Sequence, residues 1–173
     1  MAEPTRTRRT VGLPTIERRP PTDPVLGWRY WQLRPDGLLR SVTHRRVVWR
    51  PDEPLRAVCL IGGHAAPAAG CACGVHAEPT LEILRSQGLC TAPGEPLVMG
   101  RVALWGSVVT DEHGLRAEFA SPRRLSLVTD EASPPSGILS ALGRYCGGVD
   151  AVTPGDALGD VAAAVLSFQS MSR

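Results

Sequence analysis

Lysine is missing from this chain, and all 19 basic residues are arginine. Alanine, glycine and proline are abundant as well, and this bias is typical of a GC-rich genome. The number of arginines therefore says little about nucleic-acid contacts, and their placement matters more. Residues 1–19 carry five arginines and two acids, a net of +3, while the remainder carries 14 arginines and 15 acids, a net of −1. The positive charge thus belongs to the N-terminal segment.

Long apolar runs are also absent. No stretch of 18 or more apolar residues occurs, so we expect no membrane-spanning helix. The N-terminal segment has no apolar core after its arginines, which argues against a secretory signal. We therefore expect a cytoplasmic protein, in which thiols stay reduced. The five cysteines agree with this, because an odd number does not complete a disulfide framework.

Motifs of several well-known enzyme classes are missing too. The sequence has no Walker loop, no G-x-G-x-x-G, no G-x-S-x-G and no H-E-x-x-H. It also has no C-x-x-C pair. Cys90 and Cys146 stand alone, and we interpret both as buried filler rather than as nucleophiles. No reaction is indicated, and we favour a protein that is not an enzyme.

The domain organisation follows from composition. Residues 1–26 are rich in proline, threonine and arginine without apolar periodicity, so we expect a disordered basic tail. A single globular domain is expected over residues 27–173, a length that suits one hydrophobic core. Frequent glycine (18) and proline (16) divide the chain into short elements, which favours strands and turns over long helices.

Strand patterns dominate the first half of this domain. Two strand-like runs flank Pro35-Asp36-Gly37, a turn sequence, and predict a hairpin. Alternation continues through residues 41–49, where neither face is cleanly apolar, and this predicts an edge or partly exposed strand. The short apolar run at residues 55–62 predicts a buried strand.

The second half contains the clearest strand pair, over residues 96–128 with its turn at 111–114. Gly106 beside Trp105 predicts a bulge in it. Helical patterns occur at residues 78–88 with Thr80 as N-cap, at 138–146 and at 155–170. The prediction is a strand-rich α+β fold, a small curled antiparallel sheet or barrel with two or three added helices.

The most informative segment is residues 59–77, which holds three of the five cysteines and two of the four histidines. Zinc prefers four thiolate or imidazole ligands in a tetrahedron. Cys71 and Cys73 can supply two of them from a tight turn flanked by glycines. Cys59 follows an apolar run and offers a third, and His64 can fold back after two glycines as the fourth. The sequence therefore predicts a closed Cys3His metal site, with zinc as the metal.

Several alternatives stay open for this segment. His76 competes with His64 as the nitrogen ligand, and a Cys3His set can also hold a [2Fe–2S] cluster. A site with three protein ligands and a water would be catalytic, with Glu78 as the nearest carboxylate for a general base. The alternative without metal is a glycine- and alanine-rich loop whose cysteines are small apolar filler.

A nucleic-acid interface is a further alternative. Arginines cluster in the tail and on the strand expected after the first hairpin, and three aromatic residues near Gly27 could offer stacking faces. Such a tail would bind weakly and in a salt-sensitive way. We favour the interpretation that Trp28 or Trp31 packs in the core, because alternation sends Trp28 and Tyr30 to one side and Trp31 to the other. The residues concerned are Arg6, Arg8, Arg9, Arg18, Arg19, Trp28, Tyr30 and Trp31.

Three blocks carry a resemblance: GWRYWQLRPDGLLRSV, HAAPAAGCACGVHA and GRVALWGSVVTDEHGLRAEFASPRRL. They resemble a group of small, uncharacterised actinobacterial proteins with an H-x-A-P and C-x-C-G signature and a later L-W-G-x-V-V hairpin. The resemblance covers roughly residues 27–125 and implies no reaction. It implies that the three cysteines and His64 act as one constellation, and it disfavours His76, whose position is more often aromatic in that group.

The sequence thus favours a small zinc-binding accessory or regulatory protein that acts through protein–protein interaction. The metal ligands predicted for it are Cys59, His64, Cys71 and Cys73. A metalloenzyme or iron–sulfur redox protein is one alternative. A nucleic-acid-binding protein that uses its basic tail is the other.

Overall fold

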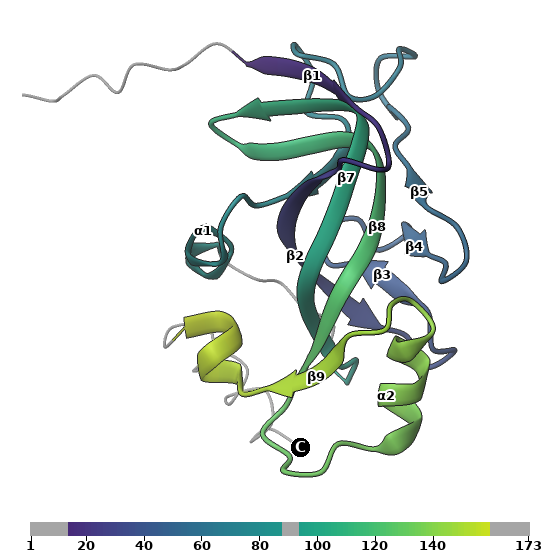
Figure 1. Ribbon diagram of the computed structural model, residues 1–173, viewed down its shortest axis with the longest axis vertical. Coiled ribbons are helices and arrows are strands. Elements are labelled where there is room, and N and C mark those ends of the chain that lie inside the picture. The colour runs from purple at the N-terminus through teal and green to yellow at the C-terminus, as the bar shows by residue number, and fades with distance from the viewer. Residues whose placement is uncertain (1–13, 88–93, 160–173) are drawn as a thin grey trace, which may run out of the picture.

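A computed structural model describes residues 14–87 and 94–159. The described chain forms one nine-stranded sheet, in which six strands follow the order β4-β3-β2-β7-β8-β5 and three further strands pair with β7 or β8. Its centre is the long hairpin of β7 (Leu97–Asp111) and β8 (Gly114–Val128), which bends strongly along its length (Figure 1). The strand-rich α+β prediction is confirmed. The sheet is curled and open, so it is not a barrel.

The predicted first hairpin is present. β2 (Val25–Leu33) and β3 (Leu39–Ser41) pair antiparallel, and β4 (Val48–Trp49) extends the sheet beyond β3. The turn between the first two is closed by a hydrogen bond from the Gly37 N–H to the Arg34 carbonyl at 2.9 Å. A positive φ of 76° at Gly37 explains why glycine ends the Pro-Asp-Gly turn.

Five other strands of the described chain pair with the outer edges of the central hairpin. β2 pairs with the first half of β7, and β1 (Thr15–Arg19) pairs with its second half. β5 (Leu55–Arg56), β6 (Val75–Ala77) and β9 (Val149–Val152) lie along β8. Only the β8–β9 pair is parallel among the described strands. The register of β7 against β8 shifts at two places, Arg101/Val102 and Trp105/Val108. The shift at Trp105/Val108 is the predicted bulge at Gly106.

The N-terminal boundary differs from the expectation. Residues 15–19 form a strand rather than part of a disordered tail, whereas residues 1–13 lie outside the described residues. The apolar pattern is missing because four of the five β1 residues are exposed. Backbone pairing with β7 holds the strand, aided by ion pairs from Arg19 to Glu17 and Asp23.

Two other strand predictions are wrong. Residues 42–47 form bends and turns, so that only Val48 and Trp49 of the predicted 41–49 strand pair with β3. The run at 55–62 is a strand only at Leu55–Arg56, after which the chain leaves the sheet. Leu60 is 87% exposed and Ile61 is 95% exposed, so this apolar run is not buried.

Hydrophobic residues pack on both faces of the sheet. Alternation along β2 sends Trp31 into one cluster and Tyr30 into the other. The larger cluster includes Trp49 in edge-to-face contact with Trp31, at 5.5 Å between ring centroids. Helix α2 (Ser136–Gly143) covers it through Leu142.

The smaller cluster is covered by two helical segments. Helix α1 (Leu81–Ser86) begins at its predicted N-cap, where the Thr80 side chain accepts a hydrogen bond from the Ile83 N–H. Leu84 of this helix is buried. Residues 154–159 are also helical, and the Tyr30 hydroxyl donates to the Ala157 carbonyl at 2.6 Å. The rest of the predicted 155–170 helix lies outside the described residues.

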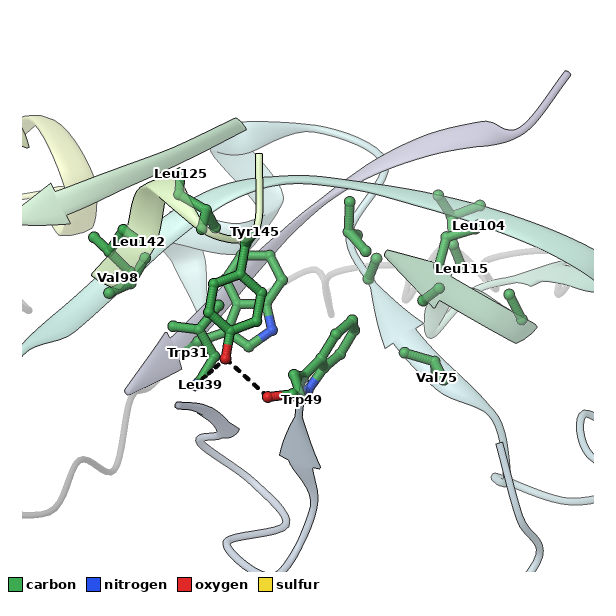
Figure 2. Packing of buried hydrophobic residues seen from close by; sticks show 14 of the residues in the cluster. Trp31, Leu39, Trp49, Val75, Val98, Leu104, Leu115, Leu125, Leu142 and Tyr145 are labelled. Atoms are coloured by element: carbon green, nitrogen blue, oxygen red, sulfur yellow. Dashed lines mark hydrogen bonds between the residues drawn. The ribbon is translucent and has the colours of Figure 1, made fainter. Parts of the chain in front are cut away.

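The hydroxyl of Tyr145 bridges the backbones of β3 and β4. It accepts from the Leu39 N–H at 2.7 Å and donates to the Trp49 carbonyl at 2.8 Å (Figure 2). Tyr145→Phe leaves both backbone groups buried and unpaired. We expect the free energy of unfolding, measured with urea, to fall by about 1–3 kcal/mol. A loss within error of zero would show that water or another group replaces the hydroxyl.

Candidate metal centre

The predicted metal-binding residues lie in one loop, residues 57–74, here called the cysteine loop. The two strands that flank it pair with adjacent parts of β8: Arg56 of β5 opposes Phe119, and Val75 of β6 opposes Ala117. The loop therefore leaves and rejoins one edge of the sheet at neighbouring positions. In Figure 1 it rises from β5 at the upper right of the view. A loop of this length without regular structure is uncommon unless it is functional.

The structure brings four predicted ligands together. One ligand atom from each of them lies within 4.8 Å of all the others. The set, here called the Cys3His cluster, is Cys59, His64, Cys71 and Cys73. Among the described residues no carboxylate belongs to it.

The distances within the Cys3His cluster suit one tetrahedral ion. The Cys59 and Cys71 sulfurs lie 3.9 Å apart, and the His64 Nε2 lies 3.3 Å from the Cys73 sulfur. Zinc bonds of about 2.3 Å to sulfur and 2.0–2.1 Å to nitrogen would place two sulfurs about 3.8 Å apart and a sulfur and a nitrogen about 3.6 Å apart. The sulfur separation is also far beyond the length of a disulfide bond, about 2.05 Å.

Gly62 and Gly63 explain how His64 reaches the sulfurs. A Cβ at residue 62 would lie 2.4 Å from the His64 Nδ1, so a side chain there would displace the imidazole. Gly63 has a φ of 62°, the left-handed conformation that glycine adopts at little cost. The pair thus turns the chain back on itself and leaves room for the ring. This is the local reason why the sequence Gly-Gly-His delivers a nitrogen to Cys73.

The thiols sit in unequal environments. Hydrogen bonds from the backbone N–H groups of Gly62 and Ile61 lower the pKa of Cys59, and the Gly62 N–H lies 3.2 Å from its sulfur. Burial raises the pKa of Cys73. N–H donors directed at Cys59 favour its thiolate, the form that binds a metal.

The side chain of Arg116 on β8 is hydrogen-bonded to the backbone of the cysteine loop. This side chain is 3% exposed, and its Nη1 donates to the carbonyls of Ala68, Cys71 and Cys73. Its Nη2 pairs with Asp111 at 2.5 Å. Burial acts to raise the pKa of Asp111, but the hydrogen bonds from Arg116 and the His113 N–H, together with the Arg116 charge, outweigh it and the pKa is lowered. One guanidinium therefore fixes three loop carbonyls, a role that the sequence analysis did not predict.

His76, the competing ligand, lies outside the Cys3His cluster. Its Nε2 is 2.7 Å from the Ala72 carbonyl, to which it donates, so this nitrogen is engaged by the backbone. Burial lowers the pKa of His76, which agrees with a neutral ring. The His76 side chain links β6 to the cysteine loop. Because its Nε2 is engaged there, His64 is the better candidate for the nitrogen ligand.

Alanine substitutions distinguish the roles of His64 and His76. His64→Ala removes a ligand, so we expect the zinc affinity to fall by more than the roughly 10- to 100-fold cost of losing an outer partner. His76→Ala removes only the bond to the Ala72 carbonyl and should stay within that range. Competition against a chromophoric chelator measures both affinities. An equal or larger loss for the His76 variant would contradict the assignment of His64.

The remaining candidate residues do not join the cluster. Glu78 is buried and exchanges backbone hydrogen bonds with Trp28 at 2.7 and 2.8 Å, but its carboxylate is not among the clustered atoms. Cys146 is half-buried, with its thiol directed at the Gly148 carbonyl. Cys90 lies outside the described residues.

Part of the surface expected for nucleic acid is used within the protein. Trp31 is buried in the larger cluster, as we favoured, and Tyr30 is buried in the smaller one, so neither offers a face for base stacking. Arg40 pairs with Glu95 at 2.8 Å. The arginines at positions 6, 8 and 9 lie outside the described residues.

Comparisons of the chain with protein-family models, curated proteins and solved structures find no match. The resemblance to the actinobacterial group therefore stays a prediction. Within residues 14–87 and 94–159, no helix has the length and apolar character needed to cross a membrane.

Proposed function

We propose that this is a small accessory or regulatory protein that binds one zinc ion through its Cys3His cluster and binds another protein through the loop that the zinc fixes. The observation that carries the proposal is the gathering of four ligand atoms within 4.8 Å on a loop without regular structure.

A single ion fits the cluster better than an iron–sulfur cluster does. A [2Fe–2S] group contains two irons, and the ligands of one iron are separated from those of the other by the width of the group. Four ligand atoms all within 4.8 Å leave little room for that width. Three thiolates and an imidazole are a common zinc set, and four protein ligands close the coordination sphere. A closed site without a neighbouring carboxylate supports a structural role rather than catalysis.

A structural ion also supplies what the cysteine loop lacks. The described part of the loop contains no helix or strand, and its outward apolar residues contribute no core. Structural zinc can contribute about 10–16 kcal/mol of apparent binding free energy. Binding would therefore fix the loop against β8, where Arg116 already holds its carbonyls.

The loop presents an apolar surface next to the metal. Val58, Leu60 and Ile61 are 70%, 87% and 95% exposed and flank the ligand Cys59. Single exposed apolar residues are ordinary, but three within four positions on a metal-fixed loop support an interaction surface. Arg46 and Arg56 are exposed beside it. The partner is thus a protein segment that presents apolar side chains flanked by carboxylates.

Crosslinking in the native cells tests the partner surface. Ile61→Gln keeps the metal ligands and should weaken a discrete crosslinked complex by about tenfold or more, since a central apolar contact is lost. Ile83→Gln is the matched control, because Ile83 is 43% exposed on α1, outside the cysteine loop. Equal crosslinking of both variants and the wild type, with zinc retained, would contradict the proposal.

A further inference from the structure

A cavity opens beside the cysteine loop. Its volume is about 510 Å³, within the range of about 300–1,000 Å³ that is typical of small-molecule sites. Three segments form its walls: residues 41–48, residues 55–61 and residues 71–76. Most of the wall is apolar, from Val47, Val48, Leu55, Ala57, Val58, Leu60 and Ile61.

The polar part of this wall holds three arginines beside the three cysteines of the Cys3His cluster. Arg29, Arg46 and Arg56 line the cavity, and no Asp or Glu occurs among its described lining residues. Arg46 and Arg56 are exposed, whereas Arg29 is half-buried and its Nε is shielded from solvent. Arg46 and Arg56 are therefore the solvent-exposed arginines of the cavity, and Arg29 is the shielded one.

Arg29 is a cation whose partners are all neutral. Its Nη1 donates to the His76 carbonyl, and its Nη2 donates to the Ser41 hydroxyl at 2.9 Å. The guanidinium lies over the ring of Trp49, 5.4 Å from the centroid. The Nε has no hydrogen-bond partner in the described part of the chain.

This arrangement differs from that of Arg116, which pairs with Asp111. Within the described chain, no carboxylate lies within ion-pair distance of Arg29. Burial lowers the pKa of Arg29 to about 10, so the side chain is still charged at neutral pH. A shielded charge without a counter-ion is costly, and an anion that enters the cavity would remove that cost.

We propose that the cavity binds a small carboxylic acid with an apolar body. The carboxylate lies against the Arg29 guanidinium, and the apolar body lies along the valine and leucine side chains. The exposed Arg46 and Arg56 attract the anion. The volume accommodates a whole small molecule, which favours a free acid over the end of a protein chain. Cys59, Cys71 and Cys73 also line the cavity, so the acid would lie beside the proposed zinc site.

Titration of the full-length, zinc-loaded protein with octanoate tests the proposal. Calorimetry gives the affinity and stoichiometry, and the Nε–Hε resonance of Arg29 in a ¹⁵N spectrum reports an anion bound beside the guanidinium. We expect one octanoate per chain and a shift of the Arg29 resonance. Octan-1-ol, which has the same chain without the charge, should bind at least about tenfold more weakly, because charge-assisted hydrogen bonds are the stronger ones.

Two matched variants separate the site from general surface charge. Arg46→Gln should weaken octanoate binding severalfold, whereas Arg45→Gln should leave it unchanged, because Arg45 is exposed next in sequence but does not line the cavity. Arg29→Gln should weaken binding by about tenfold or more. If Arg29→Gln fails to fold, the shift of the Arg29 resonance and the comparison of the Arg45 and Arg46 variants still test the proposal.

Three results would overturn the proposal. The first is the absence of octanoate binding to protein whose zinc content is complete. The second is equal binding of octan-1-ol, which would show an apolar cavity alone. The third is an equal loss in the Arg45 and Arg46 variants, which would show binding by surface charge.

Discussion

Replacing Cys71 by serine is expected to release the metal and to lower the free energy of unfolding by about 4 kcal/mol or more. Cys71 supplies one of four ligand atoms, and its sulfur lies 3.9 Å from that of Cys59. Serine is a poor ligand for zinc beside thiolates. Without the ion, the cysteine loop has no regular structure to hold it, and its backbone would leave β8. Metal analysis and urea unfolding measure the two effects.

The matched control for this variant is Cys146→Ser. Cys146 is also a half-buried free thiol, but it lies outside the Cys3His cluster. This variant should keep a full complement of metal. A chelator added to the wild type should reproduce the unfolding curve of the Cys71 variant. A Cys71→Ser protein that stays fully metallated and as stable as the wild type would contradict the ligand assignment.

Arg116→Met is expected to have the second largest effect. It leaves Asp111 as a nearly buried carboxylate without its partner and removes the donor shared by three loop carbonyls. Breaking a buried ion pair in this way costs about 3–5 kcal/mol. The zinc affinity should fall about 10- to 100-fold as well, because the loop that carries Cys71 and Cys73 loses its support.

Arg124→Met on the same strand is the control. Arg124 pairs with Asp150 at 2.6 Å, but its side chain is 66% exposed. Exposed pairs contribute little to stability, so this variant should unfold almost as the wild type does and bind zinc equally well. Equal losses in the two variants would show that Arg116 has no special role in supporting the loop.

The Arg116 pair also has a pH dependence of known sign. The folded-state pKa of Asp111 is lower than its ordinary value. The pair therefore stabilises the protein fully at pH values above the ordinary aspartate range. Its contribution is lost as the pH falls through the lowered pKa, and Arg116→Met should remove this part of the acid sensitivity.

Local signals in the sequence were enough to predict the central elements. The strand pair at 97–128, its bulge at Gly106 and the Thr80 cap each depend on neighbouring residues, and all three are present. The Gly-Gly-His order was likewise sufficient to predict that His64 folds back toward the cysteines. Short-range geometry determines these features, so they are visible without the fold.

Features that depend on the cysteine loop were not predictable in the same way. The apolar run at 55–62 resembles a buried strand, yet Leu60 and Ile61 are exposed because the chain leaves the sheet to bring Cys59 to the other ligands. β1 was missed for the opposite reason, since its backbone pairs while its side chains stay exposed. Apolar sequence and burial are thus uncoupled in the 55–62 run, whereas strand pairing and burial are uncoupled in β1.

The environments of Arg116 and Arg29 could not be predicted either. Arg116 alternates with Leu115 and Ala117 on β8, a pattern that predicts a solvent-facing side chain. The cysteine loop covers that face and turns Arg116 into a buried donor. Arg29 follows Trp28 on β2 and is enclosed by segments near residues 41 and 76. Neither environment exists until distant parts of the chain meet.

Zinc X-ray absorption on the anaerobically purified, untagged protein, with metal analysis of the same sample, tests the central claim most directly. The account predicts one zinc per chain in a shell of three sulfurs at about 2.3 Å and one nitrogen at about 2.0–2.1 Å. Iron in place of zinc, a water in the zinc shell, or a folded protein with reduced cysteines and no metal would contradict it.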